Sequence, residues 1–207
     1  MTRRIFVPRD STALALGAEV TARAIAVEAR RRGEVVDLVR TGSRGLYWLE
    51  PMVEIEIAGE RRAYGPVAAD DVPSLFEAGF LEGGAHALAL GIVNRIDYLA
   101  RQERLTFARC GVVDPLSIGD YRARGGFRGL ARALAMAPAE VVQAVIDSGL
   151  RGRGGAGFPT GIKWRTTAET PAAQKYIVCN ADEGDSGTFA DRMLMEGDPF
   201  LLIEGMA

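Results

Sequence analysis

The spacing of apolar residues in the first part of the chain alternates between the periods of a strand and of a helix. Residues 5–7 are apolar and precede Pro8, which predicts a short strand. Residues 12–32 predict a helix, because apolar side chains recur at helical spacing at Leu16, Val20, Ala24 and Val27. A glycine ends this helix, and residues 35–39 predict a second strand.

The next segments predict two further strands and a helix. Residues 52–57, MVEIEI, alternate apolar and acidic side chains, as in an antiparallel strand with one solvated face. A turn at Gly59 leads to RRAYGPV, and DDVPSLFEAG has acidic residues at a helix start and Gly79 at its end. The order β-α-β-β-β-α predicts a small α/β domain of thioredoxin-like type over residues 1–92.

The remaining residues predict a connector and the start of a second domain. Residues 93–147 form a helical connector, with helices over RIDYLARQERL and APAEVVQAVIDSG. A glycine-rich loop follows, then a short helix near residues 159–168, a strand over KYIVCN (residues 175–180) and a helix that begins in the final LLIEGMA. We expect residues 148–207 to be the N-terminal part of an α/β domain that is incomplete within this chain.

Charge and cysteine content narrow the classes of partner. The formal charge is -2, with 25 Lys and Arg against 27 Asp and Glu, so we expect no nucleic-acid partner. No apolar run reaches the length that spans a bilayer, and we expect no membrane partner. The two cysteines, Cys110 and Cys179, are far apart, which predicts buried, inert thiols in a cytoplasmic protein.

The stretch GLRGRGGAGFPTGIKW, residues 149–164, is the most unusual in the chain. Gly152, Gly154 and Gly157 formally satisfy G-x-G-x-x-G, but a helix precedes them, which argues against a dinucleotide fingerprint. A glycine run can still form a nest of N–H groups that binds an anion, with Arg153 and Lys163 supplying charge. A flexible surface turn and an RGG-type RNA contact are the alternatives.

A second polar loop, CNADEGD, follows the predicted strand over residues 175–180. Its amide and carboxylate groups can accept hydrogen bonds from ring N–H groups and sugar hydroxyls, so it is either a flavin or ribose reader or a solvated turn. The aromatic ring of Phe158 either faces a planar ligand or belongs to a core.

The motifs SGLRGRGGAGFPTGIKW (residues 148–164) and YIVCNADEGDSGTFADR (residues 176–192) together resemble the flavin-binding subunit of NADH dehydrogenases. That superfamily includes the NADH-oxidising subunit of respiratory complex I, the diaphorase subunit of NAD-reducing hydrogenases and the β subunit of soluble NAD-dependent formate dehydrogenases. The segments GDSGTFADRMLMEGDPFLLIEGM, LTFARCGVVDPLSIGDY and RTGSRGLYWLEP are most similar to the formate dehydrogenase β subunit.

This resemblance implies cofactor-binding roles for two groups of residues. The FMN phosphate and flavin would lie near Gly152, Arg153, Gly154, Gly155 and Lys163. The ribityl chain or ring would be read by Asn180, Asp182, Glu183 and Gly184, and NAD would face Phe158 and Asp185. Many relatives have Glu at the last position, where this chain has a side chain one methylene shorter.

The resemblance also implies a reaction and partners. Hydride would pass between nicotinamide and flavin, and the flavin would exchange single electrons with iron–sulfur clusters, so no catalytic acid, base or metal ligand is assigned here. A molybdenum- or tungsten-containing subunit would oxidise formate, and a small iron–sulfur subunit would complete the complex. The family's 4Fe-4S cluster would lie in a downstream part, and no cluster is expected within residues 1–207.

The N-terminal domain resembles a thioredoxin-like ferredoxin domain, but Ser43 and Tyr47 stand approximately where two cluster cysteines would be. We therefore interpret residues 1–92 as a docking domain without a cluster. Two alternatives to a formate dehydrogenase subunit remain open: a diaphorase subunit of a hydrogenase or of a complex I-like NADH dehydrogenase, and a non-catalytic assembly fragment.

Overall fold

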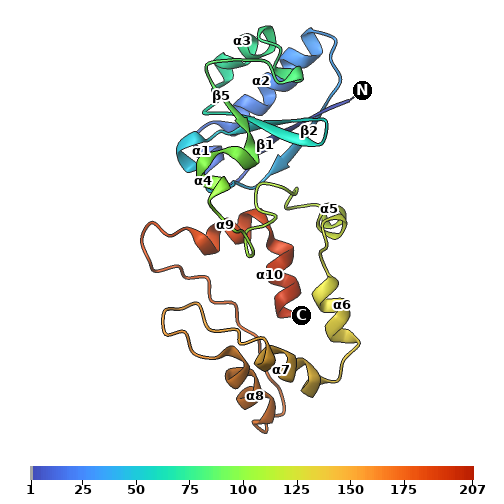
Figure 1. Cartoon of the computed structure of the whole chain (residues 1–207), viewed down its shortest axis with the longest axis vertical. Helices are drawn as coiled ribbons and strands as arrows, with labels where there is room; N and C mark the ends of the chain where they lie inside the picture. Colours follow the sequence, from blue (N-terminus) through green and yellow to red (C-terminus); the bar gives the residue numbers. More distant parts are fainter. Residues whose placement is uncertain (1) are drawn as a thin grey trace. The chain divides into compact units, whose positions relative to one another are not determined.

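The computed structural model describes residues 2–207, which divide into two units (Figure 1). The sheet unit comprises Met1–Arg124 and Ala181–Leu202, and the glycine-loop unit comprises Gly125–Asn180 and Ile203–Ala207. Within the described residues no helix is both long and apolar enough to cross a membrane.

The sheet unit is built on a five-stranded mixed sheet in the order β2-β1-β3-β4-β5. Its strands are β1 (Arg3–Pro8), β2 (Val36–Thr41), β3 (Val53–Ile57), β4 (Glu60–Tyr64) and β5 (Ala89–Ile92). β1 and β2 are parallel, and every other neighbouring pair is antiparallel. The parallel pair requires a crossover, which α1 (Ser11–Ala15) and α2 (Ala18–Arg31) supply. The predicted α/β class is confirmed, and β5 is an element that the sequence pattern did not predict.

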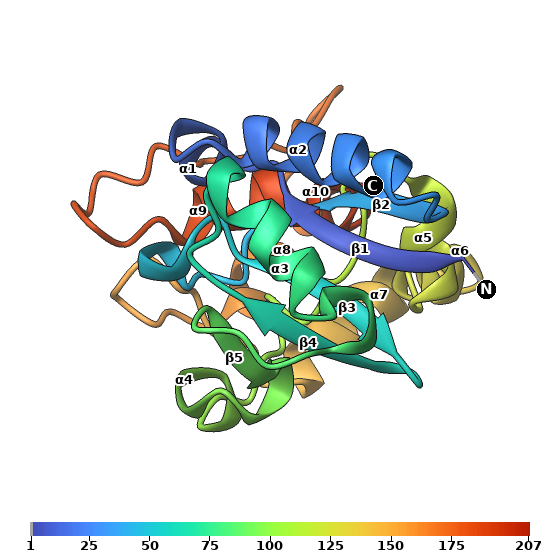
Figure 2. The ribbon, with the colours of Figure 1, turned by 90° about the horizontal axis from the view of Figure 1, so that it is seen from above.

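The main core lies between the sheet and the helices α2 and α3 (Val72–Glu77), which lie on the same side of the sheet (Figures 1 and 2). α2 turns three alanines and one larger side chain inward, namely Ala18, Ala22, Ala29 and Ile25. The periodic valines that predicted the helix, Val20 and Val27, are 61% and 64% exposed. The single helix predicted over residues 12–32 is instead two helices, because the chain turns at Gly17, whose φ is 97°. Within α2, mainly alanines form the buried stripe because they let the helix approach the sheet closely.

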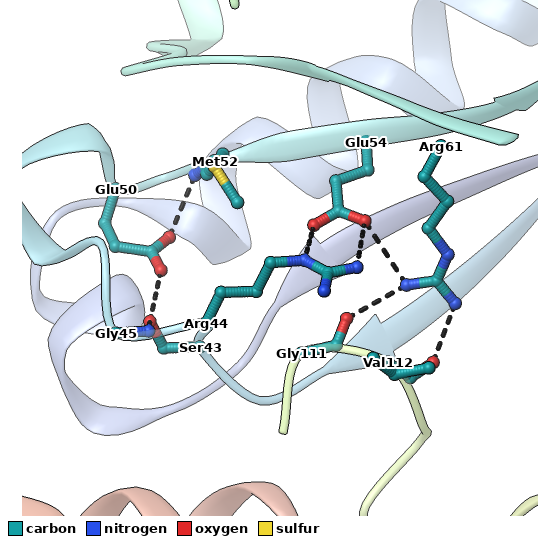
Figure 3. Close-up of polar contacts among 9 residues, drawn as sticks. All are labelled: Ser43, Arg44, Gly45, Glu50, Met52, Glu54, Arg61, Gly111 and Val112. Atoms are coloured by element: carbon teal, nitrogen blue, oxygen red, sulfur yellow. Dashed lines mark hydrogen bonds and ion pairs between the residues drawn. The ribbon is translucent and has the colours of Figure 1, made fainter. Parts of the chain in front are cut away.

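The other face of the sheet is covered as well, which corrects the prediction of a solvated acidic face on β3. Glu54 is only 3% exposed and lies between two arginines (Figure 3). Arg44 donates from Nε and Nη2 to the two carboxylate oxygens of Glu54, at 2.5 and 2.9 Å. Arg61 donates to the same carboxylate and to the carbonyls of Gly111 and Val112. These bonds hold residues 111–112 against the sheet.

The sheet unit is completed by three short helices, α4 (Asp97–Ala100), α5 (Ile118–Ala123) and α9 (Ala190–Gly197). The helix predicted over residues 95–105 is wrong in length, because α4 stops at Ala100. Only Leu99 of α4 is buried, whereas Leu105 is 82% exposed, so no continuous apolar face holds a longer helix in place.

The glycine-loop unit contains α6 (Arg128–Leu134), α7 (Pro138–Asp147) and α8 (Thr160–Glu169). The final helix, α10 (Pro199–Met206), agrees with the helix predicted for the chain's last segment. The strand predicted over KYIVCN is wrong, because residues 171–180 form neither helix nor strand. A strand needs a hydrogen-bonded neighbour, and no described strand pairs with this segment.

Candidate functional site

The glycine-rich stretch forms a loop whose two ends are joined by backbone hydrogen bonds. The N–H of Gly152 donates to the carbonyl of Phe158 at 2.8 Å, and the N–H of Thr160 donates to the carbonyl of Leu150 at 2.9 Å. Arg151 closes the loop further, because its Nε donates to the carbonyl of Gly157 at 2.6 Å. Residues 153–157 are therefore held as a projecting tip and not as a flexible linker.

The tip of this loop leaves its backbone open on the outside. A Cβ atom built on Gly154 or Gly155 would meet no atom within 4 Å. Gly155 and Gly157 have φ angles of 99° and 60°, which side chains rarely adopt. Glycine is thus required at these two positions by the conformation, and the space beside the tip is free for a ligand.

Two positive charges accompany the open tip. Arg153 has no ion pair or hydrogen bond among the described residues. Lys163 also lacks an ion pair in the part of the chain that the structure describes, and its Nζ lies 5.8 Å from the centre of the Phe158 ring. The ring is 46% exposed, so Phe158 does not belong to a core. No side chain caps the N-terminus of α8, which begins immediately after this loop. These features together suit an anion.

The loop is positioned by the contact between α7 and α8. Gly161, in the first turn of α8, is buried against Ile146 of α7. A Cβ at Gly161 would come within 2.6 Å of the Ile146 Cα, so the two helix backbones approach closely only because this residue is glycine. α8 therefore carries Lys163 on a helix that is anchored next to the loop.

The acidic loop has a different local structure. The carboxylate of Glu183 accepts the N–H groups of Asp191 (2.9 Å) and Arg192 (3.1 Å), at the start of α9. Burial opposes ionisation of Glu183, but these N–H donors lower the pKa of its carboxyl below the usual value. In this structure Glu183 thus caps the start of α9 from the preceding loop, a role that the sequence pattern did not predict.

The predicted cofactor-binding residues of the glycine loop and the acidic loop belong to two different units. Gly152, Arg153, Gly154, Gly155, Phe158, Lys163 and Asn180 belong to the glycine-loop unit, whereas Asp182, Glu183, Gly184 and Asp185 belong to the sheet unit. The structure brings the first six together around one loop. A Cβ at Gly184 would lie 3.3 Å from the Asp182 carboxylate, and the carbonyl of Asp185 accepts the N–H of Thr188 at 3.3 Å.

The two cysteines differ in environment. Cys110 is buried as predicted, and burial raises the pKa of its thiol to about 12, so it stays protonated. Cys179 is exposed, which corrects the prediction of a second buried thiol. Its segment lacks a strand partner among the described strands, and the neighbouring Ile177 and Val178 are 67% and 83% exposed for the same reason.

Residues that stand near the expected cluster cysteines form a polar network that the sequence pattern did not indicate. Ser43 donates to Glu50 at 2.6 Å, and the second oxygen of Glu50 accepts the N–H of Met52 (Figure 3). Burial of Glu50 raises the pKa of its carboxyl to about 7. Tyr47 contacts Arg192, whose guanidinium lies 5.4 Å from the ring centre. Among residues 2–207, no three His, Cys, Asp or Glu side chains are grouped to hold a metal ion.

Comparison with known proteins finds similarity that includes the C-terminal part of the chain. Residues 145–207 match the family described as the Nuo51 FMN-binding domain. The chain is 58% identical over 107 residues to the NADP-reducing hydrogenase subunit HndC of Solidesulfovibrio fructosivorans, covering 52% of this chain and 22% of that protein. It is 47% identical over 94 residues to an NADH-quinone oxidoreductase subunit of Escherichia coli, covering 44% of this chain and 21% of that protein.

A solved structure resembles part of the chain only weakly. The thioredoxin-like [2Fe-2S] ferredoxin from Aquifex aeolicus aligns with 15% identity and a TM-score of 0.38, covering 44% of this chain and 93% of that one. The chain spans about a fifth of the length of the two curated relatives. What the comparisons show is that residues 145–207 match the Nuo51 FMN-binding domain and that the chain is similar, over about half its length, to subunits of NADP-reducing hydrogenase and NADH-quinone oxidoreductase.

Proposed function

We propose that this chain contributes to the FMN site of an NAD-dependent diaphorase subunit in a cytoplasmic multisubunit oxidoreductase. The observation that carries the proposal is the glycine loop, whose open tip adjoins the unpaired charges of Arg153 and Lys163 within the segment that matches the FMN-binding family. A phosphate group needs this combination of accessible N–H groups and positive charge.

The residues of the loop can be assigned to the FMN phosphate and to the nicotinamide nucleotide. The backbone of Gly152, Gly154 and Gly155 would face the phosphate, and Arg153 and Lys163 would neutralise its charge. Phe158 offers an exposed aromatic face for the nicotinamide nucleotide. When bound, FMN supplies hydride exchange with nicotinamide and single-electron transfer to iron–sulfur clusters.

The polar groups of the second loop would read the remainder of the cofactor. Asn180, Asp182, Glu183 and Gly184 are proposed for the ribityl chain or ring, with Asp185 toward NAD. Because Glu183 caps α9, its carboxylate is oriented by backbone N–H groups before any ligand arrives. Its part in binding would then be to hold the loop, while Asn180 and Asp182 contact the cofactor.

The test is a chimera of the Solidesulfovibrio fructosivorans relative in which residues 145–207 of this chain replace the matching segment. We expect the purified chimera to retain flavin, identified as FMN after release by denaturation. Lys163→Ala should lower that FMN content, whereas Lys175→Ala should not, because the Lys175 ammonium is bound to the Ala168 carbonyl. A chimera that folds, by circular dichroism, without retaining flavin would contradict the proposal.

We propose more specifically that the complex is a formate dehydrogenase. The partners of this chain would then be a molybdenum- or tungsten-containing subunit and a small iron–sulfur subunit. This proposal rests on the segments LTFARCGVVDPLSIGDY and RTGSRGLYWLEP, and a downstream 4Fe-4S cluster would complete the electron path. Purification of the native complex through a tag on this chain, followed by metal analysis, tests this assignment. Molybdenum or tungsten would support it, and nickel would support the hydrogenase alternative.

A non-catalytic docking role for the sheet unit is the second candidate. Ser43 is engaged with Glu50 and Tyr47 contacts Arg192, so neither position offers a thiolate for a cluster. Retention of the partner subunits by residues 1–124 alone, in a pull-down from the native complex, would support this role. Loss of all partners would oppose it.

A further inference from the structure

A pocket of about 440 Å³ opens beside the second face of the sheet, within the sheet unit. Two arginines, Arg44 and Arg104, line it, together with Asn94 and Gln102. Apolar side chains that include Leu99 and Val112 form the rest of the wall. The side chains of the four polar residues, Arg44, Arg104, Asn94 and Gln102, can all donate hydrogen bonds. The polar side of the pocket is therefore suited to a ligand with hydrogen-bond acceptors.

The Arg44 guanidinium has one nitrogen to spare. Its Nε and Nη2 are bound by the Glu54 carboxylate, whereas Nη1 has no partner among the described residues (Figure 3). The residue as a whole is only 8% exposed. Nη1 is nevertheless not among the fully enclosed polar atoms without a partner, so it is reached by solvent. Arg44, a buried residue that lines the pocket, thus keeps one unused donor.

The arginines at and beside the pocket carry more positive charge than the carboxylate paired with them can neutralise. Arg44 and Arg61 share the single carboxylate of Glu54. Arg104 has neither an ion pair nor a hydrogen bond in the described part of the chain. Burial, together with the positive charge of Arg44, lowers the pKa of Arg104. Two guanidinium groups that repel each other across a pocket are stabilised when an anion lies between them.

The wall of the pocket formed by Arg44 and Val112 is held in place before any ligand binds. Gly111 packs so closely on Arg44 that a Cβ at Gly111 would collide with the Arg44 Cγ. Arg61 fixes the same turn by donating to the carbonyls of Gly111 and Val112, at 2.9 and 2.7 Å. Arg44 itself is oriented by two bonds to Glu54. A donor that is already oriented, as Arg44 is, loses little conformational entropy on binding.

We propose that this pocket binds the phosphate group of a small molecule through Arg44 and Arg104. The excess positive charge matches a doubly charged phosphate, and the two guanidinium groups with the amides of Asn94 and Gln102 match its several acceptor oxygens. The volume exceeds that of free phosphate, and the apolar wall can pack against an organic part. The site is separate from the glycine loop, which belongs to the other unit.

Isothermal titration of the 207-residue chain tests the proposal, with inorganic phosphate and ribose 5-phosphate as probes at constant ionic strength. Arg104→Gln should weaken binding about tenfold or more, the scale of losing a charge-assisted hydrogen bond. The matched control is Arg101→Gln, which removes the same charge from an exposed side chain paired with Asp97 nearby. It should leave the affinity unchanged.

Because the glycine loop is also proposed to receive a phosphate, the titration is repeated with Lys163→Ala. The component that depends on Arg104 should persist in that variant. Tighter binding of ribose 5-phosphate would identify the ligand as a phosphate ester, and equal binding would identify free phosphate; both support the site. The proposal would be overturned if neither probe bound, or if the Arg104 and Arg101 variants lost affinity equally.

Discussion

Glu54→Gln should destabilise the sheet unit strongly, because it removes the carboxylate that two buried arginines share. The side chains of Arg44, Arg61 and Glu54 are 8%, 11% and 4% exposed. Glutamine preserves the size of the side chain but cannot neutralise either guanidinium. Breaking a buried ion pair by removing one partner costs about 3–5 kcal/mol. Two features of this site place the cost within that range: one of the two bonds from Arg44 is lost together with the negative charge, because the glutamine NH2 group cannot accept a hydrogen bond, but Arg61 keeps its two carbonyl acceptors.

The assay is urea denaturation followed by far-ultraviolet circular dichroism, with Glu56→Gln as the matched control. Glu56 lies two residues along the same strand, is more exposed, and is paired with Arg4 at 3.8 Å. Its loss should cost less than about 1 kcal/mol, as for other exposed pairs. If the free energy of unfolding fell equally in the two variants, the Glu54 carboxylate would not be compensating buried charge, and the reasoning would be refuted.

Three further predictions concern other parts of the chain. Glu50 has a pKa of about 7 in the folded state against 4.5 in the unfolded state, so the native state binds more protons between these two pH values. The free energy of unfolding should therefore fall by about 3 kcal/mol as the pH rises from 4.5 to 7. Glu50→Gln should abolish this dependence in urea titrations carried out at a series of pH values. Gly161→Ala should destabilise the contact between α7 and α8 by about 1–3 kcal/mol, because its Cβ would collide with backbone. The control is Gly119→Ala, whose Cβ would meet only a hydroxyl at 3.7 Å and which should not destabilise its helix. Thermal melts monitored by far-ultraviolet circular dichroism compare the two variants, and equal melting temperatures would contradict the close packing. Lys163→Ala in the chimera should weaken FMN binding by about 1–3 kcal/mol, measured by quenching of flavin fluorescence, and unchanged affinity would return this lysine to the ordinary surface.

Local patterns predicted four of the five strands of the sheet unit and the helical regions that contain α2 and α3. The first two strands and the helix between them were visible because each has its own periodicity and its own terminal glycine or proline. The pattern could not show β5, since Ala89–Ile92 is short and contains a glycine. Its pairing depends on β4, which supplies the hydrogen-bonding partner from a distant part of the sequence.

The same distinction explains the errors in the candidate site. Tyr176, Ile177 and Val178 have high β preference, yet they form no strand because none of the described strands pairs with them. The glycine loop was identified from its composition alone. What composition could not supply was the closure of the loop by Gly152 and Phe158, which converts a run of flexible residues into a held tip.

The sequence by itself determined the periodicities and the two motifs that match an FMN-binding family, because these depend on residues close together in the chain. The tertiary structure decided which faces are covered. Alternation along β3 placed Glu54 opposite Val53 and Ile55, but it could not show that Arg44 and residues 111–112 enclose that face. Burial is set by segments distant in sequence, and it is burial that turns an ordinary surface carboxylate into the partner of two arginines beside a polar pocket.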